Sequence, residues 1–184
     1  MTTIFSNNED IDSDVLRGLF SNIPNNNLIE ITYPIKSTNW VDMVEEAIKN
    51  EDDTLVLCGH GSHEGLYFPK FEDYIIHDYN AKLIHARRVI CCWCYASSFV
   101  QTHNIHNCIA SSMFISNVEE AMDNCLYNST QEDINNVCRQ IDSELNWLIR
   151  SDIPISEWVM RIGCHLDVEN EIDVFNRQGI IFNE

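Results

Sequence analysis

Short apolar runs alternate along the chain with segments in which apolar residues recur every three or four positions. The continuous runs Thr54–Cys58 and Arg88–Cys92 are typical of strands that are buried on both faces of a parallel sheet. Similar runs over residues 3–6, 28–33 and 108–114 predict three further strands. The pattern therefore predicts at least five strands, distributed over the first two thirds of the chain.

Helical spacing appears between these runs and dominates the last third of the chain. Apolar residues recur with helical period over 11–23 and 40–48. The clearest stripe comprises Ile134, Val137, Cys138, Ile141, Leu145, Leu148 and Ile149. Ser129 and Glu132 precede this stripe with the spacing of a capping box. Strands that alternate with helices predict a single α/β domain over 1–184, with a mostly parallel sheet covered by helices on both faces.

Weaker patterns fill the remaining segments. Residues 71–85 are apolar enough for a crossover helix, and residues 37–39 offer caps for the helix that begins at 40. A helix over 155–166 and an edge strand over 179–182 complete the prediction. We expect the three tryptophans on apolar helical faces to belong to the core; they are Trp40, Trp147 and Trp158.

The charge balance limits the classes of partner. The 184 residues include 29 Asp and Glu against 11 Lys and Arg, a formal net charge of −18. Nucleic acids and anionic membranes need clustered positive charge, so neither is expected as the main partner. A basic peptide or protein surface would be attracted to this chain, although an acidic excess more often serves only solubility.

The eight cysteines do not have the spacing of a disulfide framework. Cys91 and Cys92 are adjacent, and several others lie within apolar runs where free thiols pack well. The sequence also has no amino-terminal signal and no apolar run long enough to span a bilayer. We therefore expect a reducing, cytoplasmic location, where a cysteine at a polar strand end is catalytic or metal-binding.

Two of the predicted strands end in reactive side chains. The strand Thr54–Cys58 leads into Gly59-His60-Gly61, and the strand Arg88–Cys92 leads to Cys94. The carboxyl ends of parallel strands meet at one edge of a sheet, so neighbouring strands would bring both groups to one substrate bond. An imidazole can take the thiol proton, and the N–H of Gly61 can stabilise an oxyanion.

These segments resemble the caspase-like cysteine peptidases, a superfamily that includes metacaspases, gingipains, legumain and the CHAT branch. The segment 57–67, LCGHGSHEGLY, is similar to the block in which a buried strand ends in His-Gly. The segment 89–97, VICCWCYAS, resembles the block that ends in the catalytic cysteine, and 108–121 is similar to the strand that follows in the CHAT branch. The resemblance implies a three-layer caspase-like fold and an endopeptidase that needs no cofactor. His60 would be the general acid/base, Cys94 the nucleophile and Gly61 part of the oxyanion hole.

Three alternatives remain beside this interpretation. His63 would serve as the base if His60 were an ordinary turn residue. A small zinc site could use Cys91, Cys94, His103 and His106, whose spacing suits the metal. The chain could also be a catalytically silent interaction module with a caspase fold, or need a regulatory partner for activity.

Acidic residues next to the motifs suggest a substrate preference. Glu64, Glu119, Glu120 and Asp123 follow the strands, and the nearest cations, Arg87 and Arg88, precede one. A carboxylate facing Lys or Arg forms charge-assisted hydrogen bonds and repels acidic competitors. Trp93 and Tyr95 flank Cys94, and these flanking residues differ from those of the caspase motif. The aspartate specificity of caspases is therefore not expected. The sequence thus predicts a protein or peptide substrate cleaved after a basic residue.

Overall fold

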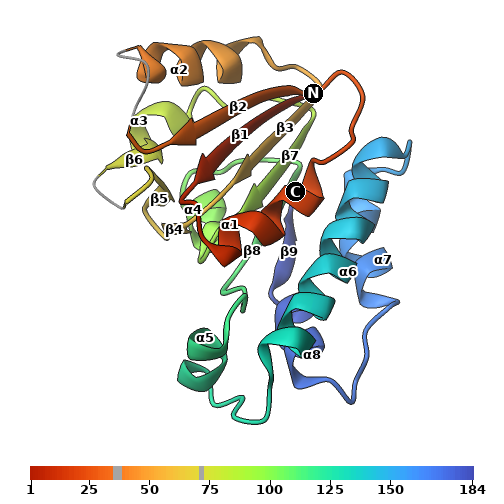
Figure 1. Cartoon of the computed structure of the whole chain (residues 1–184). Helices are drawn as coiled ribbons and strands as arrows, with labels where there is room; N and C mark the ends of the chain where they lie inside the picture. Colours follow the sequence, from red (N-terminus) through yellow and green to blue (C-terminus); the bar gives the residue numbers. More distant parts are fainter. Residues whose placement is uncertain (35–38, 71–72) are drawn as a thin grey trace.

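A six-stranded, mostly parallel sheet forms the centre of the protein (Figure 1). The computed structural model describes residues 1–34, 39–70 and 73–184. The strand order is β2 (Asn27–Thr32), β1 (Thr2–Asn7), β3 (Thr54–Cys58), β7 (Arg88–Cys92), β8 (Cys108–Ser111) and β9 (Ile180–Asn183). The first five strands run parallel, and β9 pairs antiparallel with β8 at the edge of the sheet. The prediction of an α/β fold with a mostly parallel sheet is confirmed.

Side chains on successive strand positions enter two separate hydrophobic clusters, one on each face of the sheet. In β3, Leu55 and Leu57 belong to one cluster, whereas Val56 and Cys58 belong to the other. This alternation is the two-residue period of a strand, and it explains why a strand buried on both faces has a continuous apolar sequence. All five residues of β3 are buried.

Helices supply the partners for both clusters (Figure 1). Apolar residues of α2 (Trp40–Asn50) and α4 (Ala96–Thr102) join the first cluster. The second cluster takes apolar residues from the helices of the last third of the chain, α6 (Gln131–Arg150), α7 (Trp158–Gly163) and α8 (Glu171–Gln178). Two short helices, α1 (Ile11–Leu16) and α5 (Val118–Asp123), pack against the same cluster and lie where strands of the sheet end.

The segment expected to form a crossover helix over 71–85 contains a strand and one short helix instead. A second sheet of three strands, β4 (Gly61–Ser62), β5 (Gly65–Tyr67) and β6 (Tyr74–Ile76), precedes the four-residue helix α3 (Asp78–Ala81). Ile75 and Ile76 are buried, and β6 pairs antiparallel with β5. These contacts explain why residues 74–76 form a strand rather than part of a helix. Residues 71 and 72 lie outside the described residues.

Details at the helix ends also differ from the prediction. The capping box of α6 uses Thr130 and Asp133, one residue after the predicted pair. Asn39 occupies the N-cap position of α2 without a side-chain cap, and the other two predicted caps, residues 37 and 38, lie outside the described residues.

The three tryptophans divide between core and surface. Trp158 is fully buried and Trp40 packs against a hydrophobic cluster, but Trp147 is 52% exposed. Trp147 lies two positions after Leu145, off the apolar stripe of α6, so the helix turns it toward solvent. The expectation that it belongs to the core is wrong.

Within the described ranges, we find no helix with the length and apolar character required to cross a bilayer.

Candidate active site

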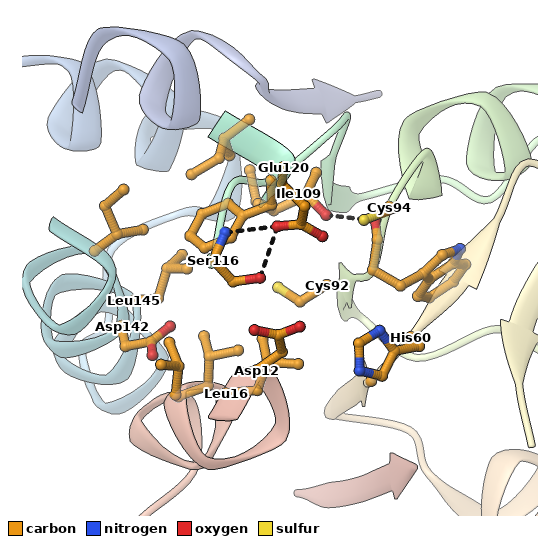
Figure 2. Close-up of a pocket in the computed structure, with 18 residues that line it drawn as sticks. Asp12, Leu16, His60, Cys92, Cys94, Ile109, Ser116, Glu120, Asp142 and Leu145 are labelled. Carbon is orange, nitrogen blue, oxygen red and sulfur yellow. Dashed lines mark hydrogen bonds between the residues drawn. The ribbon is translucent and has the colours of Figure 1, made fainter. Parts of the chain in front are cut away.

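One pocket collects side chains from segments that follow four parallel strands (Figure 2). Asp12 comes after β1, His60 after β3, Cys94 after β7 and Glu120 after β8. Apolar residues of α1 and α6 complete the lining, together with Asp142 of α6. The pocket therefore occupies the position expected of a binding site in a parallel sheet.

The predicted pair His60 and Cys94 follows adjacent strands. β3 and β7 are hydrogen-bonded neighbours, and their last residues, Cys58 and Cys92, are partners in the register. His60 and Cys94 both line the pocket. The structure therefore brings the two residues of the sequence prediction to one site.

A glycine turn delivers His60 into the pocket. Gly59 has φ +145°, in a region that favours glycine, and a Cβ there would lie 2.7 Å from the Cβ of Ser6. The backbone N–H of Gly59 donates to the carbonyl of Cys92 at 3.2 Å, which ties the turn to the neighbouring strand. No other residue type would fit this turn without moving β1.

Asp10 holds the ring of His60. Nε2 of His60 lies 3.0 Å from Oδ2 of Asp10. The other carboxylate oxygen, Oδ1, caps α1 by accepting the backbone N–H of Ser13 at 2.9 Å. Burial disfavours ionisation of Asp10, but hydrogen bonds from Ser13 and Asn8 and the nearby His60 outweigh it and lower the pKa of Asp10. An ionised carboxylate at this position can orient the imidazole and stabilise its protonated form.

Cys94 stands at a sharp turn between β7 and α4. The next residue, Tyr95, has left-handed backbone angles (φ 66°, ψ 21°), and its N–H donates to the carbonyl of Ser112 at 2.9 Å. Burial, with smaller effects of Glu120 and Asp12, raises the pKa of Cys94 to about 11, although a backbone hydrogen bond at Phe114 opposes the shift. The resting thiol is therefore neutral at pH 7, and it could act as a nucleophile only if a base removed its proton.

Only one of the four acidic residues predicted to bind substrate lines the pocket. Glu120 does so, and its Oε2 accepts hydrogen bonds from the N–H and the hydroxyl of Ser116 at 2.8 and 2.9 Å (Figure 2). Glu64 instead accepts a hydrogen bond from the hydroxyl of Tyr74 at 2.7 Å, outside the pocket. Glu119 and Asp123 are on α5 and do not line the pocket either.

Packing accounts for the glycine after His60. A Cβ on Gly61 would lie 2.2 Å from Cδ1 of Trp93, whose indole N–H donates to the carbonyl of Ser62 at 2.9 Å. Gly61 does not itself line the pocket, so its role in an oxyanion hole stays a prediction. His63 is exposed and lies outside the pocket, so the structure gives it no place as an alternative base.

The four residues of the zinc alternative do not come together. Cys91 is fully buried in the hydrophobic cluster opposite the pocket, with its sulfur 3.8 Å from that of Cys108. The ring of His103 packs on Phe99 at 4.4 Å between centroids, and His106 contacts the carbonyl of the last residue. Cys91 and Cys94 therefore face different surroundings and cannot share a metal as the spacing suggested.

One other group among the described residues has ligand atoms close enough to share a cation. The side chains of Asp10, Asp12 and His60 place one ligand atom each within 4.8 Å of the others. Two carboxylates and an imidazole suit a divalent metal.

All eight cysteines, which lie in the described residues, are free thiols.

Sequence reasoning missed three acidic residues at this site, namely Asp10, Asp12 and Asp142.

Comparisons of the chain with protein-family models, curated proteins and solved structures returned no match. The chemistry of the pocket is therefore the basis for assigning a function.

Proposed function

We propose that this protein is a cysteine endopeptidase with a caspase-like three-layer domain, and that it cleaves peptide bonds after a basic residue. The observation that carries the proposal is that His60 and Cys94, delivered by adjacent strands, line one pocket. A thiol and an imidazole at the carboxyl edge of a parallel sheet are the groups that acyl transfer requires. The arrangement of helices on both faces of the sheet supports the fold part of the proposal.

The reaction divides into two steps. The sulfur of Cys94 attacks the peptide carbonyl while His60 takes the thiol proton, and the N–H of Gly61 helps to hold the oxyanion. The carbon–nitrogen bond then breaks, His60 protonates the leaving amine, and a thioester remains on Cys94. Water, deprotonated by His60, hydrolyses the thioester and restores the thiol. Asp10 supports both steps because its negative charge faces the imidazolium.

The charges of the pocket support a basic residue before the scissile bond. The carboxyl groups of Asp12 and Glu120 line it, together with that of Asp142, whose pKa burial raises, and no Lys or Arg of the described residues does. Arg87 and Arg88 lie at the other end of the sheet, where both pair with Asp53. A cationic side chain would meet complementary charge in this pocket, whereas an aspartate would be repelled.

The neutral thiol of Cys94 favours a second candidate, a silent interaction module that binds a basic peptide without cutting it. Burial and the anionic surroundings that hold its pKa near 11 suppress the thiolate when no substrate is bound. Such a module would use the same pocket, and a regulatory partner or the substrate itself would be needed for activity.

A peptide library treated with the purified protein tests both candidates. We expect cleavage after Lys or Arg, and a loss of at least about a hundredfold in kcat/KM in Cys94→Ala and in His60→Ala. Cys125→Ala removes an exposed thiol outside the pocket and serves as the matched control. Full activity in Cys94→Ala would refute the mechanism, and preferred cutting after Asp would refute the specificity. Binding of basic peptides without any cleavage would establish the silent module.

A further inference from the structure

Asp142 is a buried carboxyl group without a hydrogen-bond partner for one of its oxygens. It lies on the inner side of α6 and is 3% exposed. Among the described residues, no group donates a hydrogen bond to its Oδ2. Burial raises the pKa of Asp142 well above its usual range. Buried polar atoms are nearly always paired, so an unpaired one needs an explanation.

One side of Asp142 packs closely against the turn after α1. A Cβ on Gly18 would lie 2.9 Å from the Cβ of Asp142, so the turn after α1 fits closely against this side chain. One helical turn further along α6, the amide of Asn146 donates to the carbonyls of Gly18, Leu19 and Ser21 at 3.2, 3.1 and 2.9 Å. These bonds fix the turn against α6, and a second cavity, lined by Gly18, Ser21 and Asn146, also reaches Asp142 on this side.

Asp142 also faces the pocket of His60 and Cys94. In Figure 2, Asp142 and Leu145 stand at one end of the pocket, and His60 and Cys94 stand at the other. The cavity has a volume of about 50 Å³, room for a few water molecules or a slender chain. Its walls near Asp142 are apolar, with Leu16 among them.

The apolar walls of the pocket and the carboxyl group of Asp142 together indicate the chemistry of a ligand. Apolar walls suit an aliphatic stem, and the unpaired carboxyl group at the inner end of the pocket suits a cation. A lone carboxylate in an apolar site is costly, and an ammonium or guanidinium group would supply both the missing charge and the missing hydrogen bonds.

We propose that Asp142 receives the charged end of the substrate's basic side chain, that of the residue before the scissile bond. This inference rests on the proposed function and assigns its specificity to a residue on α6 that is far beyond Cys94 in the chain. When the cation enters, Asp142 releases its proton to solvent and binds as the carboxylate. Asp12 and Glu120 would then attract basic peptides to the pocket, and Asp142 would select the side chain.

Binding of n-butylamine, the side-chain analogue of lysine, tests the inference without relying on catalysis. Titration calorimetry would use the full chain carrying Cys94→Ala, with n-butanol as the uncharged analogue. We expect saturable binding of the amine only, and at least a tenfold weaker affinity after Asp142→Asn is added. Glu132→Gln makes the same change of charge at an exposed position of α6 and should leave the affinity unchanged. An amine affinity that is the same before and after Asp142→Asn would overturn the inference.

Cleavage assays separate this inference from the proposed function. Peptides with lysine or norleucine before the scissile bond differ chiefly in the charge, and Asp142→Asn should lower the lysine-to-norleucine ratio of kcat/KM at least tenfold. Alkylation of Cys94 should proceed at the same rate in both proteins. An unchanged ratio in an active enzyme would refute the role of Asp142 but not the peptidase. Amine binding that depends on Asp142, without any cleavage, would refute the peptidase but not the cation site.

Discussion

Nε2 of His60 lies 3.0 Å from Oδ2 of Asp10, a residue 50 positions earlier in the chain. The two side chains meet because β1 and β3, which precede them, are parallel neighbours in the sheet. The low pKa of Asp10 makes its carboxylate an acceptor only, so Nε2 of His60 carries a hydrogen. In the neutral ring, the lone pair that can accept a proton is then on Nδ1.

Replacing Asp10 by Asn should therefore slow catalysis without unfolding the protein. We expect kcat to fall about tenfold or more, because the neutral amide no longer stabilises the imidazolium. Asn also caps helices well, so the melting temperature should stay close to that of the wild type. Kinetics on a lysine peptide and a thermal melt check the two parts.

Asp10→Ala supplies the control for the cap. It removes the acceptor for Ser13 as well as the contact with His60, and should cost about 1 kcal/mol of stability in addition to activity. Wild-type kcat in Asp10→Asn would show that the contact with His60 has no catalytic role.

The reactivity of Cys94 toward iodoacetamide should rise steeply with pH. With a pKa of about 11, only about one thiol in ten thousand is ionised at pH 7, and the fraction grows about tenfold per pH unit until the pKa is approached. Glu120→Gln removes one of the nearby negative charges and should shift this rate profile to lower pH. Mass spectrometry of the labelled peptides follows each cysteine separately.

The other cysteines calibrate this experiment. Cys125 and Cys164 are exposed and should react first, whereas the fully buried Cys91, whose pKa burial raises well above its usual range, should react last. A rate for Cys94 that matches the exposed thiols at pH 7 would show that substrate-free protein already holds a thiolate.

The strands and the meeting of His60 and Cys94 in one pocket could be predicted from the sequence because each depends on local information. Thr54–Cys58 and Arg88–Cys92 are strands with the predicted bounds, since burial on both faces makes the whole run apolar. The placement of His60 and Cys94 in one pocket follows directly from where these strands end.

Asp12 and Asp142 could not be found from the sequence because they lie far from the motifs. Asp12 is near the start of the chain and Asp142 is in its last third, and only the sheet and α6 bring them to the pocket of Cys94. A signal for Asp142 did exist, because it is a charged residue beside Ile141 on the apolar face of a helix. Of the acidic residues next to the motifs, Glu120 lines the pocket, whereas Glu64 accepts a hydrogen bond from Tyr74 outside it.

A buried charge network should contribute strongly to the packing of α8 against α6. Arg177 of α8 is 4% exposed, bonds Glu144 of α6 at 2.6 and 3.0 Å, and bonds Asp173 at 2.6 Å. Arg177→Met should lower the free energy of unfolding by about 3–5 kcal/mol, because it leaves two carboxylates without their cation. Urea denaturation measures the loss.

Neutralising the partners at the same time is the matched control. The triple variant Arg177→Met, Glu144→Gln, Asp173→Asn should recover part of the lost stability, since no buried charge is then unpaired. A triple variant less stable than Arg177→Met alone would mean that the carboxylates have other stabilising contacts.

Asp142 should make the protein less stable as the pH rises. In the unfolded chain its carboxyl ionises near pH 4, whereas burial raises the pKa in the folded protein well above that value. The folded state therefore holds a proton that the unfolded state has lost, and the stability cost grows as the pH rises from about 4 toward the pKa of the folded state. Asp142→Asn removes this dependence.

The melting temperatures of Asp142→Asn and of the wild type should therefore nearly coincide at pH 4 and diverge toward pH 8, with the variant higher. At pH 8 the free energy of unfolding of Asp142→Asn should exceed that of the wild type by about 1–3 kcal/mol, because an unpaired buried carboxyl group is removed. Each kcal/mol corresponds to about 2–4 °C in melting temperature in a protein of this size. Glu132→Gln, which changes an exposed carboxylate of the same helix, should show no such divergence. A stabilised variant that no longer binds butylamine would identify Asp142 as a residue kept for ligand binding at the expense of stability. A variant less stable than the wild type at pH 8 would show instead that the carboxylate has a stabilising partner in solution, which contradicts the pocket described above.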